Sequence, residues 1–188
     1  MKKIPVIFLD RDGVINKPAR PHEYITSLED FVILPGVCEA LRLLRGAGFR
    51  IFVVTNQRCI ARKIAGREEI DALHEHMQEK FSRNGCHVDG VYVCPHGDDD
   101  NCDCRKPKPG LLCQVQRHLE ESEGVTVDKA GSWMIGDSVT DEQAGRNYGV
   151  NTVLIGGESS HEDDGRIHIT ARDMLDSARK ILEGRYSH

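Results

Sequence analysis

No apolar stretch of this 188-residue chain is long enough to cross a membrane. The longest runs, such as Val6–Leu9 and Ile51–Val54, span only a few residues, whereas a transmembrane helix needs about 20. The N-terminus also lacks the longer apolar region and the small-residue cleavage site of a secretory signal peptide, because its apolar run stops at Asp10. We therefore expect a cytoplasmic protein without a membrane partner.

An excess of positive charge is missing as well. The chain has 25 Lys and Arg residues against 30 Asp and Glu residues, a formal net charge of −5. A broad nucleic-acid-binding surface requires a basic face, so we expect no nucleic-acid partner, although a local basic pocket for a phosphate remains compatible with this balance. The content of 39% hydrophobic and 29% charged residues is ordinary for a folded protein. The length predicts one domain over residues 1–188, which we expect to be a monomer.

Short apolar runs alternate with segments of helical periodicity. The predicted strands are Val6–Leu9, Ile51–Val54, Val88–Val93, Trp133–Ile135 and Thr152–Ile155, and the predicted helices are Val37–Leu44, Arg67–Arg83, Pro109–Leu119, Asp141–Tyr148 and Ala171–Glu183. This alternation is typical of βαβ units and predicts an α/β fold, a doubly wound parallel sheet covered on both faces. Three connections are long: Asn16–Leu34, Cys94–Pro109 and the acidic loop Glu158–Arg166. We expect the first two to be functional and the third to be merely solvated.

Polar side chains follow four of the predicted strands. The segments concerned are Asp10–Gly13, Thr55–Gln57, Cys94–His96 and Gly136–Ser138. In open parallel sheets, ligands bind beyond the carboxyl ends of the strands. We therefore expect these four segments to meet at one edge of the sheet.

Asp10 and Asp12 are spaced so that both can reach one substrate, because residues two apart in an extended segment point to the same side. Together with Asp137 they would repel one another unless a cation lay between them. Mg²⁺ suits such a site, since it binds few carboxylates and phosphate oxygens. The alternative is that Asp10 or Asp12 only caps the strand end in an Asx turn. A third carboxylate at the same edge favours the metal site.

Two further segments offer groups that could hold a phosphate. The hydroxyl of Thr55 and the amides of Asn56 and Gln57 can donate hydrogen bonds, although Thr55 or Asn56 would serve equally well as a helix N-cap. Arg105 and Lys106 could neutralise phosphoryl charge in a transition state. The alternative for Arg105 and Lys106 is a solvated basic stretch.

Four soft metal ligands lie within eleven residues: Cys94, His96, Cys102 and Cys104. Three Cys and one His form a closed tetrahedral zinc site, and we expect a structural Zn²⁺ because no ligand position remains open. Scattered buried cysteines are the alternative, but this loop is hydrophilic. His74 and His76 lie two apart on a predicted helix, so they face apart and do not make a site.

Four segments resemble the motifs of the haloacid dehalogenase superfamily of phosphatases: Asp10–Asn16, Thr55–Gln57, Arg105–Pro107 and Gly136–Asp137. The cysteine loop that runs into Cys104–Gly110 is similar to that of the D-glycero-D-manno-heptose 1,7-bisphosphate phosphatase family, with the histidinol-phosphatase domain as a relative. The chain departs from the family pattern at Arg58–Cys59, where a small residue and Gly are usual, and at Lys63, where Gly is common.

The resemblance implies a Rossmann-like fold without a large cap domain, with a zinc loop at 94–109. It implies that Asp10 is the nucleophile that forms an aspartyl-phosphate, and that Asp12 protonates the leaving oxygen and then deprotonates water. The other implied roles are phosphoryl binding by Thr55 and Lys106, Mg²⁺ binding by Asp10, the Asp12 backbone carbonyl and Asp137, and substrate recognition by Arg105, with Asn56, Gln57 and Arg58 as further candidates.

The implied activity is Mg²⁺-dependent hydrolysis of the 7-phosphate of a heptose 1,7-bisphosphate, in the biosynthesis of nucleotide-activated heptose. The phosphorylated sugar would be the only partner. One alternative within the same class is histidinol-phosphate phosphatase. Another, of a different class, is a non-catalytic zinc-bearing binding module, which the intact set of Asp10, Asp12, Lys106 and Asp137 disfavours.

Overall fold

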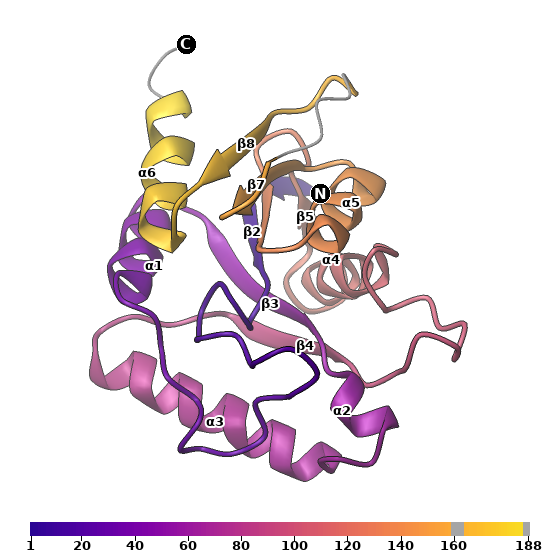
Figure 1. Cartoon of the computed structure of the whole chain (residues 1–188). Helices are drawn as coiled ribbons and strands as arrows, with labels where there is room; N and C mark the ends of the chain where they lie inside the picture. The colour runs from indigo at the N-terminus through magenta and orange to yellow at the C-terminus, as the bar shows by residue number, and fades with distance from the viewer. Residues whose placement is uncertain (159–163, 186–188) are drawn as a thin grey trace.

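The computed structural model describes residues 1–158 and 164–185. Strands and helices alternate along the chain, as the sequence predicts (Figure 1). In order they are β1 (Lys2–Ile4), β2 (Val6–Leu9), α1 (Val37–Gly46), β3 (Arg50–Asn56), α2 (Arg58–Ala61), α3 (Arg67–Arg83), β4 (Gly90–Cys94), α4 (Gly110–Glu123), β5 (Val125–Val127), β6 (Trp133–Gly136), α5 (Val139–Tyr148), β7 (Asn151–Ile155), β8 (His168–Ala171) and α6 (Met174–Arg185).

The main sheet has six parallel strands in the order β4-β3-β2-β6-β7-β8. The first of these strands in the chain, β2, lies in the middle, so the connections wind outward on both sides as in a doubly wound fold. Leu9 at the end of β2 is in register with Val53 of β3 and with Ile135 of β6. The segments that follow these three strands therefore leave the sheet at the same edge.

Helices cover both faces of the sheet, which explains why β2 is buried at every position. Ile7 and Leu9 point to one face, where they pack with apolar residues of α1, α3 and α6. Val6 and Phe8 point to the other face and pack with residues of α4 and α5. Successive side chains of β2 therefore pack alternately into two separate hydrophobic cores, one on each face of the sheet.

The structure adds elements that the sequence analysis does not predict. β1 and β5 form a small two-stranded parallel sheet, and α2 is a single turn after β3. The prediction of a helix from Ala171 is wrong at its start, because Ala171 ends strand β8 and α6 begins at Met174. Most of the acidic loop predicted at 158–166 lies outside the described residues.

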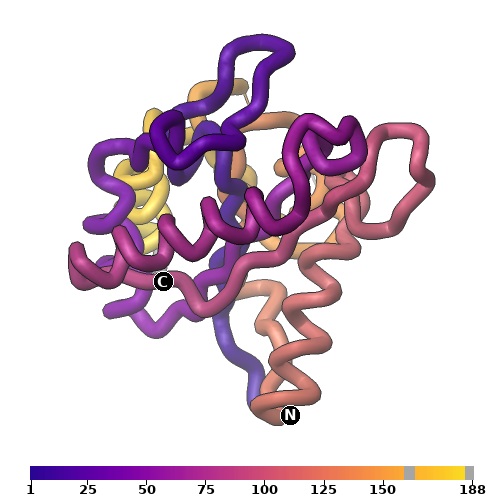
Figure 2. The backbone as a smooth tube through the Cα atoms, turned by 90° about the horizontal axis from the view of Figure 1, so that it is seen from below, coloured from indigo at the N-terminus to yellow at the C-terminus, as the bar shows by residue number. Residues whose placement is uncertain are grey.

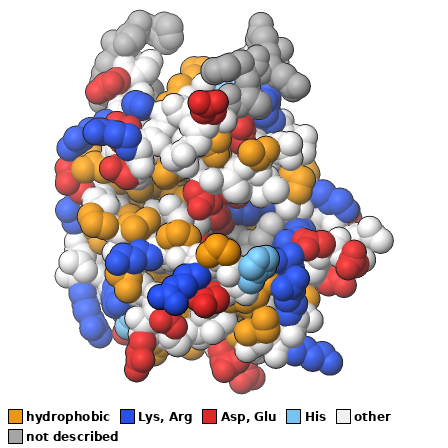
Figure 3. All heavy atoms as spheres, in the orientation of Figure 1, with side chains coloured by type: hydrophobic (Ala, Val, Ile, Leu, Met, Phe, Trp, Pro, Cys, Tyr) orange, Lys and Arg blue, Asp and Glu red, His pale blue; other side chains and the backbone are white. Residues whose placement is uncertain are grey.

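Two long connections project from the end of the molecule opposite the N-terminus (Figure 2). They are the segment between β2 and α1 and the segment between β4 and α4. Among the described residues, no larger insertion forms a cap over the carboxyl end of the sheet. No described helix is both long and apolar enough to span a membrane. On the face shown in Figure 3, acidic and basic side chains are interspersed, in keeping with their similar numbers in the sequence.

Candidate active site

Three carboxylates meet at the carboxyl end of the sheet. Asp10 follows β2, Asp137 follows β6, and Asp141 lies in the first turn of α5. One oxygen from each lies within 4.8 Å of the others. Asp10 and Asp141 are buried, whereas Asp137 reaches the surface. The convergence of Asp10 and Asp137 follows from the parallel register of β2 and β6.

Local backbone geometry fixes this group. Gly13 has a φ of 82° and lies so close to Asp137 that a Cβ atom there would be 1.8 Å from its Oδ2, so only glycine fits. Asp141 is held by the capping box of α5, in which the backbone N–H and the hydroxyl of Ser138 donate to its Oδ2 at 3.1 and 2.6 Å. The other oxygen of Asp141 is thereby directed toward the sheet edge.

Lys106 is the cation of the cluster. Its Nζ lies 2.6 Å from Oδ1 of Asp10 and 2.6 Å from Oδ1 of Asp141, and it donates to the carbonyl of Val54 at 2.8 Å. The side chain is 2% exposed. Burial favours the neutral amine, but the charges of Asp10 and Asp141 outweigh it and raise the pKa of Lys106. Lys106 is therefore a fixed positive charge at the nucleophile position that the sequence predicts.

The single positive charge of Lys106 does not neutralise the negative charges of the three carboxylates. Burial is the largest cause that raises the pKa of Asp10, to about 7, even though Lys106 opposes the shift. Partial burial and the charge of Asp141 raise the pKa of Asp137 to about 6, although that residue reaches the surface. Hard oxygen ligands at this spacing, with excess negative charge, fit a divalent cation such as Mg²⁺.

The carboxylate of Asp12 lies outside this group, contrary to the expectation that it would converge with Asp10 and Asp137. Nη2 of Arg11 lies 2.9 and 3.0 Å from its two oxygens. Asn16 donates to Oδ1 at 2.9 Å and Gln57 to Oδ2 at 3.0 Å. The Asx-turn alternative would use backbone N–H donors, whereas these bonds come from three side chains. Asp12 is thus held in one orientation beside the cluster.

The last two residues of β3, Thr55 and Asn56, and the following Gln57 connect the carboxylate group with Asp12. The Nε2 group of Gln57 donates both to Asp12 and to the hydroxyl of Thr55, at 2.9 Å for the latter. Asn56 binds the backbone of Lys106 through both ends of its amide, at 3.1 Å each. Asn56 therefore positions Lys106, a use that the sequence analysis does not foresee. Gln57, rather than Thr55 or Asn56, is the N-cap residue of α2.

Arg58 and Arg105 lie on either side of Asp98. Arg105 pairs with Asp98 at 2.7 Å and Arg58 pairs with the other oxygen of the same carboxylate. Arg58 also donates to the hydroxyl of Tyr24 at 3.1 Å. Both arginines line a cavity of about 280 Å³ that is also bordered by Asp12. The two predicted substrate-binding cations therefore share one cavity with the predicted acid.

The four predicted zinc ligands converge. The Sγ atoms of Cys94, Cys102 and Cys104 lie 3.0 to 3.7 Å apart, and Nδ1 of His96 is 3.2 Å from Sγ of Cys104. A tetrahedral Zn²⁺ with Zn–S bonds of about 2.3 Å requires sulfur separations of about 3.7 Å. The four donors therefore fit a closed zinc site, and Arg105 and Lys106 follow its last ligand directly.

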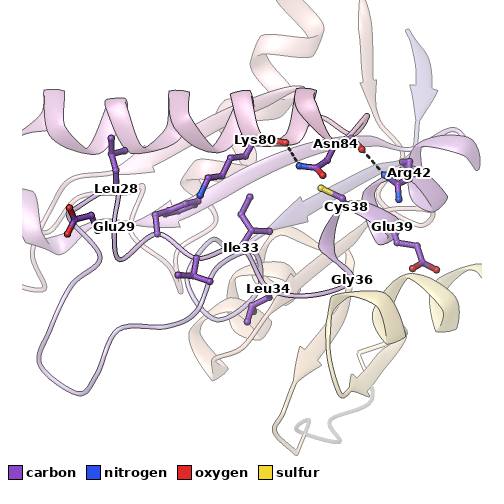
Figure 4. Close-up of a pocket in the computed structure, with 12 residues that line it drawn as sticks. Leu28, Glu29, Ile33, Leu34, Gly36, Cys38, Glu39, Arg42, Lys80 and Asn84 are labelled. Atoms are coloured by element: carbon purple, nitrogen blue, oxygen red, sulfur yellow. Dashed lines mark hydrogen bonds between the residues drawn. The ribbon is translucent and has the colours of Figure 1, made fainter.

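A larger cavity of about 590 Å³ lies elsewhere, between the loop after β2 and helices α1 and α3 (Figure 4). Arg42, Lys80 and Asn84 line it and are linked by hydrogen bonds of 2.8 Å. Of the described residues around this cavity, none belongs to the predicted site. Size alone therefore does not locate the chemistry in this protein.

The sequence analysis assigns no role to three residues that support the site. Asp141 carries a signal in the sequence, since a Ser-x-x-Asp spacing opens the helix after Gly136-Asp137. Arg11 and Asn16 lie inside the first motif, but their burial and their bonds to Asp12 come only from the fold of the loop.

Three comparisons place the chain among known proteins. A family model described as HAD-hydrolase-like matches residues 103–181. The D-glycero-β-D-manno-heptose-1,7-bisphosphate 7-phosphatase of Pseudomonas aeruginosa is 39% identical over 150 residues, which cover 80% of this chain and 80% of that protein. The enzyme of the same name from Escherichia coli is 37% identical over 161 residues, with coverage of 82% and 80%.

The fold also matches solved structures. The crystal structure of D,D-heptose 1,7-bisphosphate phosphatase from B. bronchiseptica, complexed with magnesium and phosphate, superposes with a TM-score of 0.83 at 30% identity. The match covers 96% of this chain and 99% of that one. The chain is therefore similar in sequence to these relatives over about four fifths of its length, and similar in fold to the B. bronchiseptica enzyme over nearly all of it.

Proposed function

The chain belongs to the D-glycero-β-D-manno-heptose-1,7-bisphosphate 7-phosphatase family of the haloacid dehalogenase-like hydrolases, and from this membership we propose how it acts on its substrate. The protein is a phosphoric monoester hydrolase that removes the 7-phosphate of D-glycero-D-manno-heptose 1,7-bisphosphate. The observation that carries the proposal is the buried group of Asp10, Asp141 and Lys106 at the sheet edge, with Asp137 beside it.

Asp10 is the nucleophile in this proposal. Its carboxylate attacks the phosphorus of the 7-phosphate, and the bond between phosphorus and the sugar oxygen breaks. Lys106 and Thr55 hold the phosphoryl oxygens as charge shifts during transfer. Lys106 already lies 2.6 Å from Oδ1 of Asp10, so it supports both the nucleophile and the incoming phosphate.

Asp12 is the general acid and base in this proposal. It donates a proton to the leaving sugar oxygen in the first step, and it takes a proton from the water that hydrolyses the aspartyl-phosphate in the second. One residue can do both because its protonation state after the first step is the one required for the second. Its position on the wall of the cavity that holds Arg58 and Arg105 supports this role.

Asp10, the backbone carbonyl of Asp12 and Asp137 are the residues that would hold Mg²⁺, with Asp141 next to them. When bound, Mg²⁺ would offset the repulsion between the Asp10 carboxylate and the substrate phosphate. The raised pKa values of Asp10 and Asp137 support a cation at this point. The relative from B. bronchiseptica was crystallised with magnesium and phosphate.

Cys94, His96, Cys102 and Cys104 would hold a structural Zn²⁺. The metal would fix the loop whose next residues are Arg105 and Lys106. Arg105, Arg58 and Gln57 would face the sugar and its retained 1-phosphate. Asp98 would keep both arginines at the cavity before substrate arrives, because its carboxylate binds the two guanidinium groups together.

The test is a comparison of kcat/KM for heptose 1,7-bisphosphate, heptose 7-phosphate and histidinol phosphate. We expect the bisphosphate to be clearly preferred, and Arg105→Ala to narrow the preference because it removes a contact to the retained phosphate. Equal rates on all three compounds would refute the assignment. A preference for histidinol phosphate would instead identify a histidinol-phosphate phosphatase.

A further inference from the structure

Arg11 is a fully buried arginine next to the proposed acid–base residue, and the mechanism above does not use it. A buried guanidinium group must be paired and hydrogen-bonded to be tolerated. Arg11 meets this need mainly through Asp12, to which Nε and Nη2 donate at 2.9 to 3.1 Å. Planar forks of this kind fix the orientation of a carboxylate as well as its charge.

The far side of Arg11 is anchored to two other parts of the fold. Nη1 lies 3.2 Å from Nε2 of His74 in helix α3, and Nη2 donates to the carbonyl of Ile25 at 3.4 Å. The guanidinium carbon lies 5.7 Å from the centre of the Phe31 ring. Arg11 therefore cannot rotate without breaking contacts to α3 and to the loop after β2.

His74 acts as an acceptor in this arrangement. An arginine can only donate hydrogen bonds, so the Nε2 atom facing it carries the lone pair and the ring is neutral. Burial and the charge of Arg11 agree with this, since both lower the pKa of His74, to about 4. His74 is 4% exposed, so its Nε2 atom faces Arg11 and not water.

We propose that Arg11 is the positioning residue of Asp12. His74, through its hydrogen bond to Arg11, fixes the orientation of the guanidinium group that holds the Asp12 carboxylate. The inference rests on the role proposed for Asp12. Asn16 and Gln57 complete the set of donors around the carboxylate, and Arg11 links it to helix α3 through His74. Proton transfer depends on the direction of the carboxylate oxygen as well as on its distance from the leaving group.

A purely structural role for His74 would make a different prediction. A buried ring that only fills space between α3 and the loop can be replaced by Leu with little effect on chemistry. A ring that supplies an acceptor can be replaced by Gln, whose Oε1 lies near the position of Nε2, but not by Leu. The pair His74→Gln and His74→Leu therefore separates positioning from packing.

The experiment measures kcat, KM and the melting temperature of both variants, with His76→Leu, two residues along the same helix, as the matched control. For His74→Leu we expect kcat to fall about tenfold, the effect of losing one hydrogen bond to a charged group, with KM within about twofold of wild type. His74→Gln should recover most of this loss, and His76→Leu should match wild type. Equal kcat values for His74→Gln and His74→Leu would overturn the proposal.

Arg11 itself gives a second readout. Arg11→Met removes the fork and should lower kcat about 100-fold, within the range that acid–base catalysis contributes. Arg11→Lys keeps the positive charge but not the planar guanidinium group, so it should recover only a minor part of the kcat lost in Arg11→Met. Full recovery by Arg11→Lys would show that charge alone is needed, which would contradict positioning.

Ratios to wild type can be taken on any alkyl phosphate that the enzyme hydrolyses, so an error in the sugar assignment leaves the test intact. Wild-type protein without activity on any alkyl phosphate would overturn both the proposed function and this inference. Normal wild-type activity with unaffected His74→Leu and Arg11→Met variants would overturn the inference alone.

Discussion

Replacing Lys106 by Met tests the electrostatic balance of the site. The variant keeps most of the apolar stem of the side chain but leaves Asp10 and Asp141 without the ammonium group that lies 2.6 Å from each. Both carboxylates are buried, so water cannot solvate them in place of the lost ammonium group. Removing one partner of a buried ion pair costs about 3–5 kcal/mol. A loss of this size is a large part of the ~5–15 kcal/mol that stabilises a typical domain.

The sign of the pH dependence follows from the pKa of Asp10. Burial raises it to about 7 against an ordinary value of 3.8, so the folded state binds this proton more tightly than the unfolded state does. The charged form of Asp10 is therefore a growing cost to the folded state as the pH rises from about 4 through about 7. Lys106 offsets part of that cost only when Asp10 is charged. The penalty for Lys106→Met should be larger at pH 8 than at pH 5.5.

The assay is urea denaturation of wild type and variant in metal-free buffer at both pH values, followed by titration with Mg²⁺. We expect Mg²⁺ to restore part of the stability of Lys106→Met, because the cation supplies the missing positive charge. Lys108→Met is the control, since the Lys108 side chain is exposed and lies against the carbonyl of Cys102 and the exposed carboxylate of Asp103. A free energy of unfolding within about 1 kcal/mol of wild type at pH 8 would refute the reasoning, because that falls far below the cost of an unpaired buried charge.

Other predictions follow from the same geometry. Asp10→Asn should lose nearly all turnover while its circular dichroism stays native, since an amide is a poor nucleophile; more than a few per cent of wild-type kcat would contradict covalent catalysis. Dialysed protein should retain one Zn²⁺ per chain by metal analysis, and Cys102→Ser should lower activity whereas Cys113→Ser, an exposed thiol on α4, should not. Absence of zinc, with Cys102 and Cys104 open to alkylation in the native protein, would contradict the site. Mg²⁺ should raise the melting temperature more at pH 8 than at pH 5.5, because protons compete for Asp10 and Asp137 with raised pKa values; an equal rise would count against that cluster as the binding site.

Five of the six strands of the main sheet were predictable, and the central ones read as continuous apolar runs because they are buried on both faces, as in Val6–Leu9. The small sheet of β1 and β5 was not, because Lys2–Ile4 is partly exposed and Pro5 separates it from β2. Strand β8 lies at the edge of the sheet and is only partly buried. Its pattern therefore did not stand out from the helix that follows.

The candidate site was predictable where it depends on strand ends. Asp10 and Asp137 directly follow neighbouring parallel strands and Thr55 lies near the end of the third, so their proximity follows from the register alone. The orientation of side chains was not predictable in this way. The carboxylate of Asp12 is turned by Arg11, and the amide of Asn56 binds the backbone of a residue 50 positions away. Such bonds depend on how long loops fold over the sheet.

The measurement that most directly tests the central claim is ³¹P NMR of heptose 1,7-bisphosphate incubated with the enzyme and Mg²⁺. The signal of the 7-phosphate should disappear while that of the 1-phosphate remains, with inorganic phosphate formed in equal amount, and Asp10→Asn should leave the spectrum unchanged. Accumulation of heptose 7-phosphate, or unchanged substrate with the wild-type enzyme, would contradict the account.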